Sequence, residues 1–211
     1  TITTGTGNIS ITGKGPNTST SDDILAVSNT SSTSITSTSG TITLTGSGSS
    51  AIDLPKTTIG SGGTTTITGN TVTFGAASAL TGTGAVVIEP TGSDWATNVS
   101  NSTGAIDLSG VTVDTGKASF RVGKAGSGAA TQTSKAITST GLSVAGPISL
   151  YGSDITLGAT TSVTSASDNL MVKALGSITT AATPTISTKA GDLTLWADAD
   201  ASKSGAIVLG T

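Results

Sequence analysis

Twelve carboxylates are the groups in this chain that could carry out acid–base or metal chemistry. The 211 residues include eleven Asp and one Glu, but no His and no Cys. The chain therefore lacks the side chain most often used as a general base or metal ligand, and it has no thiol. Polysaccharide lyases and hydrolases use carboxylates gathered in a groove, so the spacing of the acids decides whether such chemistry is open to this protein.

The acids are scattered along the sequence. Asp53 and Asp107 occupy the same place in two Ile-Asp-Leu segments, but these segments lie far apart in the chain. The other carboxylates that we considered stand singly, at Glu89, Asp94, Asp114 and Asp154. We interpret all of them as solvated surface charge, and we expect no catalytic residue and no enzyme activity.

Two acidic pairs bring oxygen ligands close together. They are Asp22-Asp23 and the Asp198-Ala199-Asp200 segment. Neither fits an EF-hand or the nonapeptide repeat of calcium-binding β-rolls, and no complete glycine-rich nucleotide-binding pattern is present. We therefore expect surface loops, with no bound metal ion and no cofactor.

The composition restricts the core to small side chains. Thr, Ser and Gly contribute 44, 32 and 29 residues, against two Phe, two Trp and one Tyr. Charged residues make up 10 % of the chain, the formal net charge is −3, and the mean hydropathy of +0.20 argues against disorder. Basic residues form no stripe with aromatics, so nucleic-acid binding is not expected, and no apolar run is long enough to span a membrane.

One short pattern recurs along the chain: two apolar residues separated by a single residue, usually with glycine at a flank. Alternation of this kind places both apolar side chains on one face of a short strand. We count fifteen such doublets: Ile9/Ile11, Leu25/Val27, Ile42/Leu44, Ile52/Leu54, Val72/Phe74, Val86/Ile88, Ile106/Leu108, Val111/Val113, Phe120/Val122, Leu142/Val144, Ile148/Leu150, Ile155/Leu157, Leu170/Val172, Leu193/Leu195 and Ile207/Leu209. Many of them recur with a period of roughly 20–23 positions, which is within the range of solenoid repeats.

This period predicts an all-β fold, a right-handed parallel β-helix of about ten coils, with no significant helix. At the usual strand spacing its length would be about 48 Å. Polar loops are expected at 13–23, 124–136 and 198–205. We expect residues 1–211 to form one β-helix segment and, because the chain begins with Thr1, to be a mature portion or a fragment of a larger secreted chain.

A string of immunoglobulin-like sandwiches is the alternative, since Trp95 and Trp196 stand about one such domain apart.

Five segments carry a resemblance to a known family: GNISITG (7–13), GTITLTG (40–46), GAIDLSG (104–110), SDITLG (153–158) and GDLTLWA (191–197). They resemble the repeats of filamentous-haemagglutinin-like exoproteins, which Gram-negative bacteria secrete by the two-partner route, and related repeats of autotransporter passengers. The resemblance implies a β-helical shaft, export to the cell surface, and adhesion or aggregation. The family's Asn-Pro-Asn secretion motifs have no counterpart here.

Several residues could bind a partner. Trp95, Tyr151 and Trp196 could stack on sugars, although we favour packing against a loop or a rod end as their explanation. Five asparagines stand in glycosylation sequons: Asn8, Asn17, Asn29, Asn98 and Asn101. Thr-x-Thr pairs also suggest ice binding, but their spacing in the sequence is irregular.

We therefore expect a non-catalytic, structural and adhesive shaft of a bacterial cell-surface or secreted adhesin. Its partners would be a host or neighbouring cell surface, through carbohydrate or protein, or copies of itself. The first alternative is a subunit of a self-assembling extracellular filament, and the second is a polysaccharide-active β-helix enzyme.

Overall fold

The computed structural model describes residues 1–14, 25–26, 32–47, 51–69, 71–75, 77–92, 95, 105–108, 110–126, 133 and 135–210. These residues form 22 short strands and no helix. Every strand pairing among them is parallel. The predicted parallel β-helix is thus confirmed, and the antiparallel sandwich alternative is wrong. Among the described residues there is no helix long and apolar enough to cross a bilayer.

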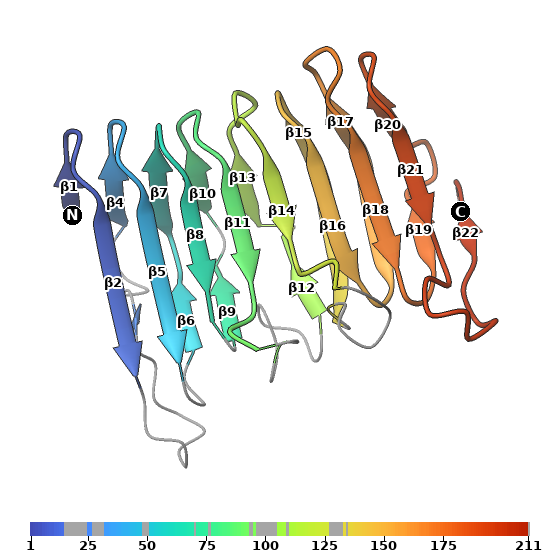
Figure 1. Cartoon of the computed structure of the whole chain (residues 1–211), viewed down its shortest axis with the longest axis horizontal. Helices are drawn as coiled ribbons and strands as arrows, with labels where there is room; N and C mark the ends of the chain where they lie inside the picture. Colours follow the sequence, from blue (N-terminus) through green and yellow to red (C-terminus); the bar gives the residue numbers. More distant parts are fainter. Residues whose placement is uncertain are drawn as a thin grey trace.

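The strands stack on three faces, which we name A, B and C. Face B is one eight-stranded sheet, and it lies in front in Figure 1. Its strands are β2 (Ile9–Lys14), β5 (Ile42–Ser47), β8 (Thr65–Thr68), β11 (Val86–Glu89), β14 (Phe120–Val122), β16 (Ile148–Gly152), β18 (Leu170–Ala174) and β21 (Leu193–Trp196). The first and last rungs, with the two chain termini, lie at opposite ends of the stack.

Faces A and C lie on either side of face B along the chain. Face A begins as a five-stranded sheet: β1 (Ile2–Thr4), β4 (Thr33–Ser37), β7 (Thr57–Ser61), β10 (Ser78–Thr81) and β13 (Val111–Val113). Face C begins with β3 (Leu25–Ala26), β6 (Ala51–Leu54) and β9 (Thr71–Phe74). A further sheet contains β12 (Ala105–Asp107), β15 (Ala136–Val144), β17 (Ile155–Val163), β19 (Ile178–Thr180) and β22 (Ile207–Val208), with β20 (Thr185–Thr188) paired to β17.

Two long strands show how the faces connect in the C-terminal half. The register between β15 and β17 shifts between Ser139 and Gly141. The first part of β17 (155–157) pairs with β19, and its second part (160–163) pairs with β20. Each long strand therefore supplies face C with its first part and face A with its second. With this assignment, eight successive coils each visit faces A, B and C in turn.

The expectation of about ten coils was therefore too high, because some coils are longer than the sequence period. In face B, Ile9 pairs with Ile42, Val86 pairs with Phe120, and Phe120 pairs with Ile148. Extra chain is inserted between these paired strands, whereas the remaining steps of face B keep the expected period. Seven steps at the usual spacing give a stack of about 34 Å.

The apolar doublets align in register across the coils. One inward column of face B contains Ile9, Ile42, Thr65, Val86, Phe120, Ile148, Leu170 and Leu193, and the next contains Ile11, Leu44, Ile67, Ile88, Val122, Leu150, Val172 and Leu195. Nearly all members between the end rungs are completely buried. Stacked side chains of similar size thus build a continuous core without many aromatics.

Glycines allow the coils to approach closely at the turn from face A to face B. A Cβ on Gly84 would lie 1.6 Å from the carbonyl oxygen of Gly63, and a Cβ on Gly146 would lie 1.6 Å from that of Ala118. No side chain fits there, so glycine is required by contact between backbones.

The predicted polar loops agree with the structure in part. The chain after β21 contains no strand until β22, as predicted for 198–205. Strand β2 continues through Gly13 and Lys14, so these two residues do not belong to the loop expected at 13–23, and 15–23 lies outside the described residues. Strand β15 begins at Ala136, so this residue does not belong to the loop expected at 124–136, of which 127–132 and 134 lie outside the described residues.

Candidate functional site

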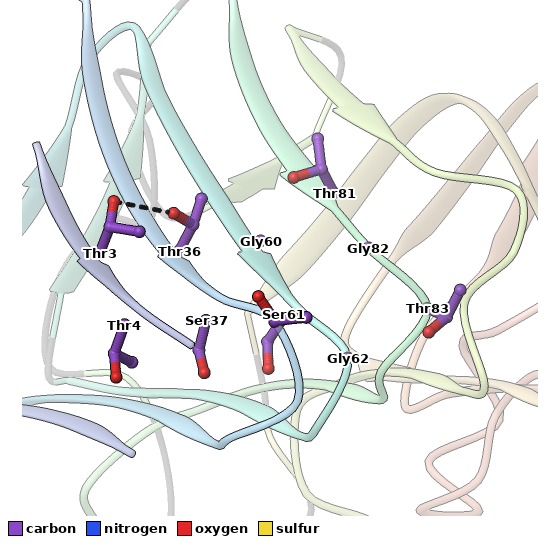
Figure 2. A pocket seen from close by; sticks show the side chains of 11 residues that line it. Thr3, Thr4, Thr36, Ser37, Gly60, Ser61, Gly62, Thr81, Gly82 and Thr83 are labelled. Atoms are coloured by element: carbon purple, nitrogen blue, oxygen red, sulfur yellow. Dashed lines mark hydrogen bonds between the residues drawn. The ribbon is translucent and has the colours of Figure 1, made fainter. Parts of the chain in front are cut away.

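A shallow groove crosses the first four coils on face A, near the turn toward face B. It has a volume of about 320 Å³ and is lined by hydroxyl-bearing side chains and glycines. Figure 2 shows Thr3, Thr36 and Thr81 along it, with Gly60 between the last two. The strand register places these four residues in one outward column. The groove exists because Gly60 interrupts a column of threonines.

Four of the hydroxyls that line the groove bind each other or the backbone of the turn. The Thr3 and Thr36 hydroxyls lie 3.2 Å apart, and the Ser37 hydroxyl donates to the Gly7 carbonyl at 2.9 Å. The Ser61 hydroxyl donates to the Gly40 carbonyl. Because none of the residues that line the groove is charged, its surface offers only neutral hydroxyls and backbone groups to a ligand.

The described carboxylates lie at separate positions. Glu89 forms an ion pair with Arg121 at 2.7 Å. Asp53 pairs across the sheet with Thr73, and Asp107 pairs with Thr138, so the two Ile-Asp-Leu acids are not on adjacent rungs. No group of three or more potential metal-ligating residues occurs in the described part of the chain. Asp22, Asp23 and Asp94 lie outside the described residues.

The acids after β21 are bound by their own loop. One carboxylate oxygen of Asp198 accepts hydrogen bonds from the Lys203 backbone N–H and the Ser202 hydroxyl, both at 3.0 Å. Asp200 accepts from the Ser202 backbone N–H at 3.1 Å, and the hydrogen bonds from Ser202 lower the pKa of this exposed carboxyl. These contacts agree with the interpretation of the segment as a surface loop.

Lys117 is a buried cation that no pattern in the sequence indicates. Its side chain is completely buried, and its Nζ donates to the Thr81 carbonyl at 2.5 Å. Burial lowers the pKa of this ammonium, and the nearby charge of Asp114 partly opposes the shift. Asp114 itself accepts from the Gly82 backbone N–H at 2.8 Å. The pair fastens the turn between β13 and β14 to the preceding coil.

The structure separates the three aromatic candidates into two groups. Trp95 is only 3 % exposed and packs in the core cluster, so the expectation that it contacts a sugar was wrong and the packing interpretation is correct. Tyr151 and Trp196 are outward residues of face B, and Lys173 lies between them in one column. Trp196 is 49 % exposed, and the Lys173 ammonium lies over its ring, 4.8 Å from the centroid.

Strand pairing brings these three residues together: Lys173 stands one coil after Tyr151 in the sequence, and Trp196 stands one coil after Lys173. Phe74, Phe120 and Trp95 are all buried. The two aromatic residues that are not buried therefore share one column, two rungs apart.

Asparagine has a role that the sequence analysis missed. Asn8 lies just before β2, and its Oδ1 accepts a hydrogen bond from the Thr41 backbone N–H of the next coil, with 2.8 Å between the nitrogen and the oxygen. Asn169, just before β18, accepts the Asp192 N–H in the same way, and Asp154 before β17 accepts the Ser177 N–H, each at 2.7 Å. We call this contact the corner bridge. It explains the Asn or Asp that precedes the apolar doublet in GNISITG and SDITLG.

Of the sequon asparagines only Asn8 is described, and its side chain is exposed. Asn17, Asn29, Asn98 and Asn101 lie outside the described residues. Glycosylation stays a prediction for all five.

The threonine pairs are regular over only part of the rod. Thr43 and Thr45 lie in register with Thr66 and Thr68 on the outside of face B, but Val87 and Glu89 follow in the same columns. Thr71 and Thr73 belong to face C. An aligned array of the kind that ice binding needs is thus short here.

Taken together, the described residues offer a neutral hydroxyl groove, a cation–aromatic column and dispersed acids. In comparisons with known proteins, no family model, no curated sequence and no solved structure matches this chain.

Proposed function

We propose that this chain is a structural and adhesive shaft segment of a bacterial cell-surface or secreted adhesin, and that it is not an enzyme. The support for the shaft is the core. Inward columns run through the eight rungs of face B, while most of the outward positions on the three faces carry Thr or Ser. In a solenoid each coil contacts only its neighbours, so such a rod can hold contact residues at fixed distances along one axis.

The observation that carries the adhesive part is the column of Tyr151, Lys173 and Trp196. Aromatic rings bind the C–H faces of sugars, and an ammonium donates hydrogen bonds to hydroxyl groups. Two rungs separate the rings by about 9.6 Å along the rod, which is close to one disaccharide repeat of an extended β-1,4-linked polysaccharide. We therefore assign carbohydrate as the ligand class and this column as the contact. Secretion and an extracellular location are supported by the resemblance to filamentous-haemagglutinin-like repeats.

The contact is tested by isothermal titration calorimetry of the chain with soluble hydroxyethyl cellulose and glycol chitin, which measures the affinity of every variant. For the wild type, tryptophan fluorescence is a second readout: Trp95 is buried, so a change should come from Trp196. Trp196→Ala and Tyr151→Ala should each weaken binding about tenfold, a loss typical of removing a buried aromatic contact.

Thr156→Ala, an exposed position on face C, is the matched control and should bind as the wild type does. Unchanged affinity of Trp196→Ala would disprove the proposed contact. Release of new reducing ends from either polysaccharide would instead favour the enzyme alternative.

A further inference from the structure

The outer surface of face B changes its chemistry at the fourth rung. In the first three coils its two central outward columns contain only hydroxyl-bearing side chains: Ser10, Thr12, Thr43, Thr45, Thr66 and Thr68. In the same columns Glu89 follows on the fourth rung and Arg121 on the fifth. Two charged residues therefore stand directly before Tyr151, where the column of Tyr151, Lys173 and Trp196 begins.

The side chain of Arg121 reaches from one outward column to the other. Its Nη2 donates to Glu89 Oε2 on the preceding rung at 2.7 Å, and its Nη1 donates to the Gly123 carbonyl at 2.9 Å. Gly123 stands between Glu89 and Tyr151 in their column. A Cβ there would overlap the Tyr151 carbonyl oxygen, so the guanidinium is the side-chain group that this rung offers beside the column.

The ion pair keeps hydrogen-bonding capacity for a ligand. The Arg121 and Glu89 side chains are 35 % and 23 % exposed. Arg121 uses two of its five N–H groups, and the second carboxylate oxygen of Glu89 accepts no hydrogen bond from the described residues. An acceptor beside a donor can bind two adjacent hydroxyls of one sugar ring. Because the two charges neutralise each other, the pair suits a neutral sugar better than an acidic one.

We propose that Glu89 and Arg121 form a further carbohydrate subsite, which continues the column of Tyr151, Lys173 and Trp196. This inference rests on the proposed function and specifies its ligand as a neutral polysaccharide bound along at least four sugar units. Glu89 lies on the fourth rung of face B and Trp196 on the eighth. Four steps are about 19 Å, which is twice the distance between the two rings and so matches two disaccharide repeats.

The subsite is tested by the dependence of affinity on ligand length. Cello-oligosaccharides and chito-oligosaccharides of two, four and six units are titrated into the ¹⁵N-labelled chain, and the indole N–H signal of Trp196 is followed by NMR. The chain has two tryptophans, and Trp196→Ala identifies the signal. We expect four units to bind about tenfold more tightly than two, as added hydrogen bonds to charged groups would give. Six units should bind little better than four, because only short hydroxyl side chains precede Glu89.

Two variants separate the new subsite from the column. Glu89→Ala and Arg121→Met should each remove the tenfold gain for four units and leave the affinity for two units unchanged, since a disaccharide contacts only the stretch from Tyr151 to Trp196. An ion pair that merely stabilises the fold would not produce this dependence on length. Thr45→Ala lies in the column of Glu89, two rungs before it, and is the matched control that should keep the full preference. Circular dichroism verifies that all variants fold.

The possible outcomes distinguish the subsite from the adhesive role. Equal affinity of the wild-type chain for two and four units would overturn the subsite and leave the proposed function standing. Equal losses for both lengths in Glu89→Ala and Arg121→Met would do the same. A wild-type chain that binds none of the oligosaccharides would overturn the carbohydrate contact and the subsite with it.

Discussion

Replacing Gly146 with alanine should separate two coils of the solenoid. A Cβ at this position would lie 1.6 Å from the Ala118 carbonyl oxygen, whereas real Cβ contacts are not shorter than 3.0 Å. The atoms that the Cβ would meet all belong to the backbone of Ala118 and Ser119, so no side-chain rotation relieves the clash. The turn that carries Gly146 must move away from the preceding coil by more than an ångström.

That movement breaks hydrogen bonds as well as packing. The Gly146 N–H donates to the Lys117 carbonyl, and the Phe120 N–H donates to the Pro147 carbonyl, both at 2.9 Å. Losing two such bonds costs about 2 kcal/mol. Loosening the buried contact between Phe120 and Ile148 adds about 1 kcal/mol. We expect Gly146→Ala to lower the free energy of unfolding by about 3 kcal/mol, measured by urea denaturation followed by circular dichroism.

Gly116→Ala is the matched control. Gly116 is exposed, and the nearest atom to an added Cβ is a Thr83 methyl at 3.7 Å, an ordinary contact. Because alanine also reduces the entropy of the unfolded chain, this variant should be neutral or more stable by up to about 1 kcal/mol. If the two variants unfold at the same urea concentration, the close approach of backbones at the corner does not hold the coils together.

Three further changes test the core, the buried lysine and the corner bridge. Thr65 is buried within an aliphatic column and its hydroxyl has no hydrogen-bond partner among the described residues, so Thr65→Val should stabilise the fold by about 1 kcal/mol in urea denaturation. Lys117 has a pKa below its ordinary 10.5, so the unfolded chain binds more protons between the two values and wild-type stability should rise with pH through that window. Lys117→Met should abolish this rise, which denaturation at pH values on both sides of the window would show. Asn169→Ala should cost about 1 kcal/mol by removing a corner bridge, while Asn169→Asp, which keeps the acceptor, should cost less in the same assay.

The architecture was predictable because it depends on side-chain alternation, which is a local property. Ile42/Leu44 and Ile148/Leu150 indicate inward pairs on short strands, and the recurrence of such pairs at a nearly constant interval requires stacking. The number of coils was harder to predict. A doublet reveals that a strand exists but not which face it belongs to, and the inserted chain between Ile9 and Ile42 has no effect on the alternation.

The candidate sites were less predictable because they arise from register. Nothing in the sequence relates Tyr151 to Lys173 or Trp196 until the rungs are aligned, and then a single column contains all three. Trp95 was included among the possible sugar contacts because its polar neighbours in the sequence suggested a loop, and only the fold shows that it is buried. Lys117 could not be foreseen, because the carbonyl that it binds belongs to the previous coil.

The corner bridge is a contact between coils that does leave a mark in the local sequence. An Asn or Asp before the doublet looks like ordinary loop composition, yet its side-chain oxygen binds the N–H that starts the next coil. The geometry needs a short side chain with an acceptor at that position, so the repeated letters in GNISITG and SDITLG reflect a contact between coils. Each bridge points from one coil to the following one, so the contact is directional. The signal that defines the repeat is thus also one that fixes neighbouring coils to each other.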